Sequence, residues 1–177
     1  MRIKNIKESI KEFFLQNPTK KLRVRQIERQ LKLPLPSVIR YTKELEKEKL
    51  LRHERIANIT LYSADKSSKE YVLEKRFFNI KQLYKSGLIQ FLADQYSNPA
   101  IIAFGSFAKG EDIEKSDIDV YIETPSKKTI NLEKFENLLK RRIHLFIYPK
   151  IQKVPNPMLA NNILNGINVN GFVEVLK

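Results

Sequence analysis

Residues 101–122 read I-I-A-F-G-S-F-A-K-G-E-D-I-E-K-S-D-I-D-V-Y-I, two apolar runs separated by a short polar segment. The first run predicts a buried strand, and a Gly-Ser turn follows it at Gly105 and Ser106. The second run carries two acids, Asp117 and Asp119, one residue apart. Because side chains at i and i+2 of a strand project from one face, both carboxylates are expected on the same side of one strand.

This acid pair predicts a metal–nucleotide site. Two like charges held so close repel each other unless something neutralises them. Mg²⁺ prefers hard oxygen ligands and is typically held by one or two carboxylates together with phosphate oxygens. Gly105 lets the backbone approach a phosphate, and the Ser106 hydroxyl and the neighbouring N–H groups can donate to it. We therefore expect Mg²⁺ as cofactor, with Asp117 and Asp119 as its ligands.

The composition is that of a folded protein without disulfides. The chain has 177 residues, of which 42% are hydrophobic and 30% charged, enough for one large or two small domains. It has no cysteine, which excludes thiolate metal sites and cysteine nucleophiles. No apolar run is long enough to span a bilayer, and the first residues lack a signal-peptide core. A cytoplasmic protein with no membrane partner is expected.

The chain is strongly basic, and its excess of positive charge is unevenly distributed along the sequence. The net charge is +13. Residues 1–65 hold 16 Lys and Arg against 8 Asp and Glu, a difference of +8, whereas the rest of the chain holds 17 against 12, a difference of +5. A basic segment attracts polyanions such as nucleic acid. The alternative is a solvated basic surface, and charge alone does not separate the two.

Residues 1–65 predict three helices and a hairpin. Apolar residues recur at helical spacing in segments 2–16, 24–31 and 36–49, and the first segment includes Ile3. Two short β-like runs follow, joined by Ala57-Asn58, where Asn58 is expected to take the left-handed conformation of a tight turn. Three helices followed by a hairpin is the order of a winged helix-turn-helix.

The segment P-L-P-S-V-I-R-Y-T-K-E-L-E-K-E-K-L-L, residues 34–51, resembles the recognition helix of winged-helix transcriptional regulators. It departs from that pattern at Thr42, where Leu is common, and at Lys49, where Gly is common. The resemblance implies binding of double-stranded DNA by the exposed side of the third helix and by the wing. The residues expected to contact DNA are Ser37, Arg40, Tyr41, Lys43, Lys47, Arg52 and Arg55. A protein–protein role is the alternative, because Glu44, Glu46 and Glu48 reduce the positive field.

Residues 66–97 predict a helical connector. Ser67 or Ser68 is expected to cap a first helix, which ends at Ser86-Gly87, and a second helix follows. The connector is rich in aromatic residues, namely Tyr71, Phe77, Phe78 and Tyr84. These residues fit core packing, inter-domain packing or the seam of a homodimer, and the sequence leaves these alternatives open.

Residues 98–177 predict a small α/β domain. The expected order is strand 100–104, helix 107–111, strand 118–122, helix 131–140, strand 143–148, helix 155–165 and strand 172–176. The fold class is therefore α+β: an N-terminal winged helix, a helical connector, and a C-terminal small mixed-sheet domain.

The pattern Gly-Ser-x-Ala-x-Gly followed by Ser-Asp-x-Asp resembles minimal nucleotidyltransferase domains of the DNA polymerase β superfamily. It covers Gly105, Ser106, Ala108, Gly110, Ser116, Asp117 and Asp119. The resemblance implies a nucleoside triphosphate bound by Gly105, Ser106, Lys109 and Ser116. It also implies that an acceptor hydroxyl attacks the α-phosphate and releases pyrophosphate. Domains of this type are often paired with a small helical protein, which is a further expected partner.

The position of the family's third carboxylate is occupied by His144, in the segment R-I-H-L-F-I. Strand alternation places His144 with Phe146 on the face that includes the site. A neutral histidine can act as a catalytic base or a metal ligand. The alternative is a DNA-binding regulator whose weakened transferase fold senses nucleotide without transferring it.

The other acids are not expected to replace the missing carboxylate. Asp112, in the loop before the acid pair, is expected to be solvated. Glu123 is expected to point away from the pair, and Glu174 cannot be placed.

Overall fold

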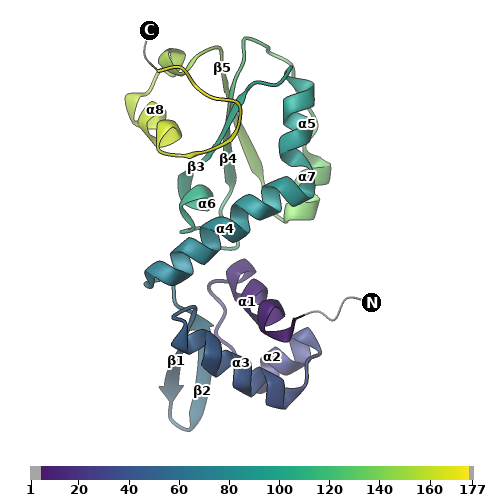
Figure 1. Cartoon of the computed structure of the whole chain (residues 1–177), viewed down its shortest axis with the longest axis vertical. Helices are drawn as coiled ribbons and strands as arrows, with labels where there is room; N and C mark the ends of the chain where they lie inside the picture. The colour runs from purple at the N-terminus through teal and green to yellow at the C-terminus, as the bar shows by residue number, and fades with distance from the viewer. Residues whose placement is uncertain (1–4, 176–177) are drawn as a thin grey trace. The chain divides into compact units, whose positions relative to one another are not determined.

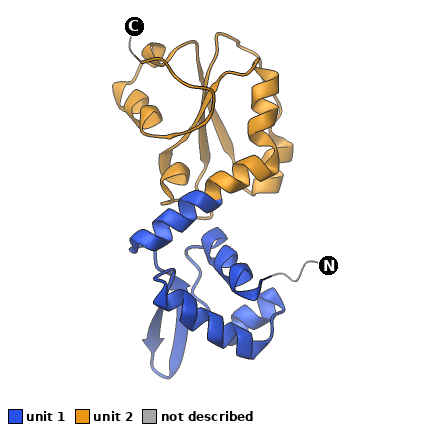
Figure 2. Ribbon diagram, in the orientation of Figure 1, with its two compact units in different colours: residues 1–78 blue, residues 79–177 orange. Residues whose placement is uncertain are grey.

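The computed structural model of the chain describes residues 5–175 and has the predicted α+β class. It divides into two compact units, residues 1–78 and 79–177 (Figure 2). None of the helices in the described range is long and apolar enough to cross a membrane.

The first unit contains three helices and a hairpin, as the sequence predicts (Figure 1). The elements are α1 (Ile6–Gln16), α2 (Val24–Leu31), α3 (Leu35–Lys47), β1 (Leu51–Ile56) and β2 (Ile59–Ala64). The three helices bury one core, formed by Ile10, Phe14, Ile27, Val38 and Leu45 among others. The strands pair antiparallel, from Leu51 opposite Ala64 to Ile56 opposite Ile59. The predicted start of the first helix, with Ile3, lies outside the described residues.

The two departures from the winged-helix pattern have structural explanations. Thr42 is buried in α3, and its hydroxyl donates to the carbonyl of Val38 at 2.8 Å, so the polar side chain is satisfied within its own helix. Lys49 has a φ of 58°, in the left-handed region that favours glycine. The backbone at this position therefore has the conformation that explains why glycine is common here in the winged-helix pattern, although this chain has a lysine.

The hairpin turn differs from the prediction. Ala57, and not Asn58, has the positive φ, at 51°. Ile56 pairs with Ile59, so the turn has two central residues. Both favoured two-residue hairpin turns require positive φ at their first central position. The position in the turn, rather than the tolerance of the asparagine side chain, decides which residue becomes left-handed.

Two helices lie between the hairpin and the sheet. The Ser68 hydroxyl accepts the N–H of Tyr71 at 2.9 Å and caps α4 (Lys69–Ser86), which confirms one of the two predicted caps. Gly87, at φ 78°, separates α4 from α5 (Leu88–Gln95). The boundary between the two units, after residue 78, falls inside α4.

The second unit is built on a four-stranded sheet in the order β5-β4-β3-β6 (Figure 1). The strands are β3 (Ala100–Phe104), β4 (Ile118–Glu123), β5 (Ile143–Tyr148) and β6 (Ile167–Asn170). The helices around them are α6 (Gly105–Lys109), α7 (Glu133–Leu139), α8 (Pro157–Leu164) and the short η1 (Ile151–Lys153). β4 is antiparallel to β3 and parallel to β5, while β6 is antiparallel to β3.

The two faces of this sheet have separate cores. Ile118, Val120 and Ile122 of β4 pack with residues of α5 and α7. Tyr121, from the other face of β4, packs with residues of η1 and α8. Figure 1 shows α8 on one side of the sheet and α5 and α7 on the other. Since Asp119 alternates with the first set, its side chain belongs to the α8 face.

Two predicted elements are displaced. α6 begins at Gly105, two residues before the predicted start. The predicted strand at 172–176 is wrong: the last strand is β6, and residues 172–175 form none, while residue 176 lies outside the described part. Gly171, at φ 63°, interrupts the extended conformation after Asn170. Asparagine is unfavourable in strands, so the alternating segment I-N-V-N was not recognised as one.

Candidate nucleotide site

The register of the sheet brings the candidate catalytic residues together. Asp119 pairs with Phe104 of β3 on one side and with His144 of β5 on the other. Residues paired across a sheet share a face, so His144 lies on the same face as Asp119, as predicted from strand alternation. Asp117 lies just before β4 rather than within it.

His144 lies between the two carboxylates. Its Nε2 is 3.8 Å from Oδ2 of Asp117, and its Nδ1 is 3.8 Å from Oδ1 of Asp119. The side chain of Asp119 is 29% exposed, that of Asp117 39%, and that of His144 52%. The three groups are therefore adjacent, and a ligand in solvent can reach all of them.

Gly105 of the Gly-Ser turn packs directly against Asp119. Gly105 has a φ of 72°, and a Cβ atom at this position would lie 2.5 Å from Oδ2 of Asp119. No side chain fits there without moving the carboxylate. The two halves of the motif, which are 14 positions apart in the sequence, thus lie so close that only a residue without a Cβ fits between them.

The carboxylates lack stabilising donors. Within residues 5–175 neither Asp117 nor Asp119 accepts a hydrogen bond, and His144 is their ion-pair neighbour. Burial raises the pKa of the Asp119 carboxyl above its ordinary value; His144 opposes this rise and the charge of Asp117 adds to it. A positive charge placed beside Asp117 and Asp119 would relieve this unfavourable arrangement.

The residues fit a metal ion that arrives with a nucleotide. No group of three or more His, Cys, Asp or Glu side chains in the described part of the chain is arranged to hold a metal ion by itself. Two carboxylates with no further protein ligand nevertheless suit Mg²⁺, because phosphate and water oxygens usually supply its remaining ligands. Asp117 and Asp119 would hold the ion.

The remaining predicted nucleotide residues lie in or next to α6 and the following loop. Ser106 is half-buried in the first turn of α6, and Lys109 is exposed in its last turn. The hydroxyl of Ser116 accepts the N–H of Ile113 at 3.0 Å, so it already stabilises the loop before Asp117. A role for these three residues in nucleotide binding stays a prediction.

Asp112 was predicted to be solvated, and this is wrong. Its side chain is fully buried and accepts hydrogen bonds from Arg141 Nη2 at 2.7 Å and Asn79 Nδ2 at 2.6 Å. Asn79 Nδ2 also donates to the carbonyl of Phe107 at 2.8 Å. Burial of a carboxylate is tolerated here because a guanidinium and an amide satisfy it.

Sequence reasoning missed Arg141, although a signal was present. Arg141 belongs to the run K-R-R, which looks like a solvated turn, but it precedes Ile143 by two residues. Strand alternation assigns it to the buried face of Ile143, whereas Arg142 is exposed. Its side chain is 9% exposed and lies over the Phe107 ring, 5.7 Å from the centroid.

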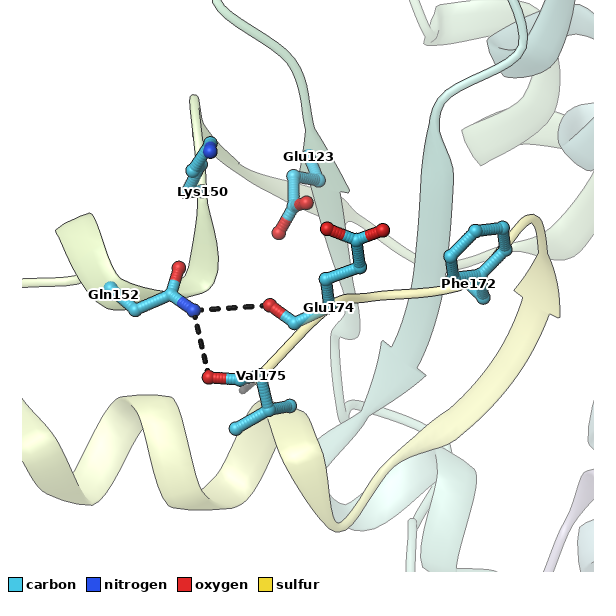
Figure 3. Close-up of a pocket in the computed structure, with 6 residues that line it drawn as sticks. All are labelled: Glu123, Lys150, Gln152, Phe172, Glu174 and Val175. Carbon is cyan, nitrogen blue, oxygen red and sulfur yellow. Dashed lines mark hydrogen bonds between the residues drawn. The ribbon is translucent and has the colours of Figure 1, made fainter. Parts of the chain in front are cut away.

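Glu123 does not point away from the acid pair. It shares the parity of Asp119 and Tyr121 on β4, and its Oε2 accepts the Tyr121 hydroxyl and the Ile151 N–H, both at 2.9 Å. It lines a separate hollow of about 500 Å³, which also includes Glu174. Figure 3 shows the two carboxyl groups directed toward the same space, while Gln152 donates to main-chain oxygens of the C-terminal segment. The predicted nucleotide residues do not line this hollow.

The predicted DNA-contacting residues are mostly exposed on α3. Arg40, Lys43 and Lys47 are exposed, whereas Ser37 and Tyr41 are half-buried. Arg40 is paired within its helix: its Nε donates to Oε1 of Glu44 at 2.8 Å, and its guanidinium lies 5.2 Å from the Tyr41 ring centroid. A phosphate or base must therefore compete with Glu44 for Arg40.

The hairpin contributes to the same surface with only one of its two predicted arginines. Lys43 and Lys47 line a hollow of about 420 Å³ whose other walls include His53, Thr60 and Tyr62 of the hairpin. Arg55 is opposite Thr60 and shares its face, whereas Arg52 is three positions away along β1 and lies on the opposite face. The structure thus groups Arg55 with the lysines of α3 and separates Arg52 from them.

The nucleotidyltransferase domain family matches residues 85–169. This range contains the Gly-Ser turn, the acid pair and His144. The second unit therefore carries a nucleotidyltransferase domain, which confirms the resemblance seen in the motif. The matched range includes α5, which the sequence had assigned to the connector; the predicted domain boundaries at residues 65 and 97 stay predictions.

Other comparisons are distant. A mutant of ZitR from Lactococcus lactis is similar in structure with a TM-score of 0.38 and 15% identity, over 54% of this chain and 65% of that one. The match thus spans just under two thirds of the ZitR chain. The winged-helix description rests on α1, α2, α3 and the hairpin themselves. A search of curated proteins finds no match.

Proposed function

We propose that the chain is a Mg²⁺-dependent nucleotidyltransferase that carries a DNA-binding winged helix. The second unit binds a nucleoside triphosphate and transfers its nucleoside monophosphate to an acceptor hydroxyl. The first unit binds double-stranded DNA. The observation that carries the proposal is the close approach of Gly105 to the Asp119 carboxylate, which supports a common site for the Gly-Ser turn and the acid pair.

Each residue has a proposed role in the transfer. N–H groups in the first turn of α6 and the Ser106 hydroxyl donate to the triphosphate, and Lys109 neutralises part of its charge. Mg²⁺, held by Asp117 and Asp119, supplies positive charge where negative charge develops on the phosphates. The acceptor oxygen bonds to the α-phosphorus, the bond from that phosphorus to the bridging oxygen breaks, and pyrophosphate leaves.

His144 is the proposed base for the acceptor proton. Neutral imidazole accepts the proton that the hydroxyl loses, and the Asp117 and Asp119 carboxylates, each 3.8 Å away, stabilise the resulting imidazolium. The chain thereby replaces the family's third carboxylate with a group of different charge.

Calorimetry with ATP, GTP, CTP and UTP, with and without Mg²⁺, tests whether the site binds nucleotide. Saturable Mg²⁺-dependent binding that is lost in Asp117→Ala is expected. Pyrophosphate release from the bound nucleotide then tests transfer. Wild-type protein that binds none of the four nucleotides would refute the proposal.

A second function is favoured by His144. The family's third carboxylate is absent, and within residues 5–175 no third acid joins Asp117 and Asp119 in a metal-binding group. A DNA-binding regulator that senses nucleotide without transferring it fits this observation. Nucleotide binding without pyrophosphate release, together with a nucleotide-dependent change in DNA affinity, would favour the regulator.

The other expected partners need separate tests. Co-purification from the native host would identify a small helical partner protein. Sedimentation of the purified chain at several concentrations would detect a homodimer. A cytoplasmic location, predicted from the sequence, would be tested by fractionation of the same cells.

A further inference from the structure

We propose that Arg141 is a positioning residue for Asp117, and that the buried Asp112 and Asn79 hold Arg141 in place for this task. The idea rests on the proposed function, since it assigns a purpose to these residues at the same site. It concerns a group that does not touch the nucleotide. Its evidence is the set of hydrogen bonds around the loop that leads to Asp117.

Both peptide groups that flank Asp117 are anchored to consecutive residues. Arg141 Nη1 donates to the Ser116 carbonyl at 2.9 Å, and this carbonyl belongs to the peptide that enters Asp117. The N–H of Ile118, in the peptide that leaves Asp117, donates to the Arg142 carbonyl at 2.9 Å. Because both flanking peptide planes are fixed, the backbone of Asp117 has little freedom to turn its carboxylate.

Arg141 also holds Ile113, the first residue of the turn at residues 113–116 that leads to Asp117. The same Nη1 donates to the carbonyl of Ile113, and Ser116 closes the turn through its own N–H to that carbonyl at 3.0 Å. The guanidinium fork therefore spans residues 113 to 116 of the loop. A lysine, with one flexible ammonium group, cannot reproduce this planar arrangement of donors.

Asp112 and Asn79 explain why a buried arginine is tolerated beside an acidic site. Asp112 accepts from Arg141 Nη2 at 2.7 Å, so the pair is electrically neutral as a whole. A neutral pair can orient Asp117 without supplying the positive charge that Mg²⁺ brings. Asn79, through Asp112 and the Phe107 carbonyl, ties the pair to α4 and α6.

Asp119 needs no such device. It lies inside β4 and is paired with strands on both sides. Asp117 lies outside the strand, so its position depends on side-chain hydrogen bonds to the loop. The difference between the two acids is what assigns Arg141 to Asp117 in particular.

The test compares Arg141→Lys with Arg142→Lys in the full chain. The control makes the same chemical change one residue away. The side chain of Arg142 is exposed, and only the backbone carbonyl of this residue takes part in the arrangement, as acceptor of the Ile118 N–H. Hydrogen exchange of the Ser116 and Ile118 amides is expected to be about tenfold faster in Arg141→Lys, because a loss of roughly one hydrogen bond opens the loop. The control should match wild type.

Calorimetry supplies a readout that a purely structural role would not change. Mg²⁺ affinity measured in the presence of nucleotide should fall about tenfold in Arg141→Lys, while nucleotide affinity without Mg²⁺ stays within about twofold. Unchanged exchange, or faster exchange with unchanged Mg²⁺ affinity, would overturn the assignment. If wild type binds no nucleotide, the proposed function fails, but the exchange rates still decide whether Arg141 holds the loop.

Should Arg141→Lys fail to fold, the double variant Asp112→Leu with Arg141→Met replaces it. Exchanging a buried ion pair for apolar side chains leaves no unpaired charge and is often tolerated. This variant lacks the hydrogen bond to the Ser116 carbonyl, so the same two measurements apply with the same expected directions.

Discussion

Asp119 occupies an environment that favours its neutral form. It is half-buried beside a second carboxylate, and this burial raises its pKa. Such a group contributes most to stability when it is protonated, and this contribution is lost as the pH rises through the raised pKa. The charged site therefore reduces stability at neutral pH, as expected where function and not folding selects the residue.

Asp119→Asn should accordingly increase the free energy of unfolding near neutral pH. The difference from wild type should shrink as the pH falls through the raised pKa and should be gone below 3.8, the ordinary aspartate value, where Asp119 is protonated in both the folded and the unfolded chain. Urea unfolding across this pH range measures it. A variant that is less stable than wild type at neutral pH would contradict the expectation.

Gly105→Ala should damage the site more than the fold. The left-handed backbone at φ 72° costs an alanine about 1–2 kcal/mol, and the new Cβ must push the Asp119 carboxylate out of place. Gly87→Ala is the matched control, because Gly87 has a φ of 78° with nothing within 4 Å of its Cβ position. Both variants should lose similar stability in thermal unfolding, but only Gly105→Ala should lose Mg²⁺-dependent nucleotide binding. Equal binding by the two would contradict the proposed site.

The elements show where sequence reasoning succeeds and where it fails. The strands that carry the motif were predictable, because β3 is apolar and buried throughout, and β4 is an apolar run interrupted only by half-buried acids at Asp119 and Glu123. That His144 shares a face with Asp119 followed from alternation as well, whereas the register that pairs the two residues did not. β6 was missed because two of its four residues are asparagines, and Arg141 was missed because its partners Asp112 and Asn79 are distant in sequence.

The ion pair between Arg40 and Glu44 on α3 leads to a prediction about DNA affinity, because DNA would have to compete with Glu44 for Arg40. Glu44→Gln should strengthen binding to duplex DNA, since Arg40 no longer has a carboxylate partner within the helix. Arg40→Ala should weaken binding and reduce the salt slope by about 1. Fluorescence anisotropy at several salt concentrations measures both changes. Glu12→Gln, the same charge change on α1, is the control, and an equal gain in that variant would point to net charge alone.

At the scale of the whole molecule, the chain contains separate cores in its two units. Phe14 and Leu92 are each at most 1% exposed, and they belong to clusters that share no residue. A chain with two independent cores does not have to unfold in one step. Calorimetry should therefore resolve two unfolding transitions.

Phe14→Ala and Leu92→Ala should each lower a different transition. Truncation of a buried side chain of this size costs about 2–5 kcal/mol. Saturating Mg²⁺ and nucleotide should raise only the transition that Leu92→Ala lowers, because ligand stabilises the unit that binds it. A single transition that shifts in every case would show that the two units unfold together.

The course of α4 constrains how these units can be separated or recombined. The helix begins in the first unit and ends in the second, where Asn79 donates to Asp112 and the Tyr84 hydroxyl donates to the Val169 carbonyl. A fragment that starts at residue 98 would remove the Asn79 donor from Asp112 and the Tyr84 donor from the Val169 carbonyl. The loop at residues 65–68 is not the boundary between the units, because Tyr71 and Phe78 of α4 belong to the core of the first unit, so a hybrid that exchanges the whole first unit has to be joined inside α4. It must splice one helix onto another in phase, since each added residue turns the remaining helix by about 100°.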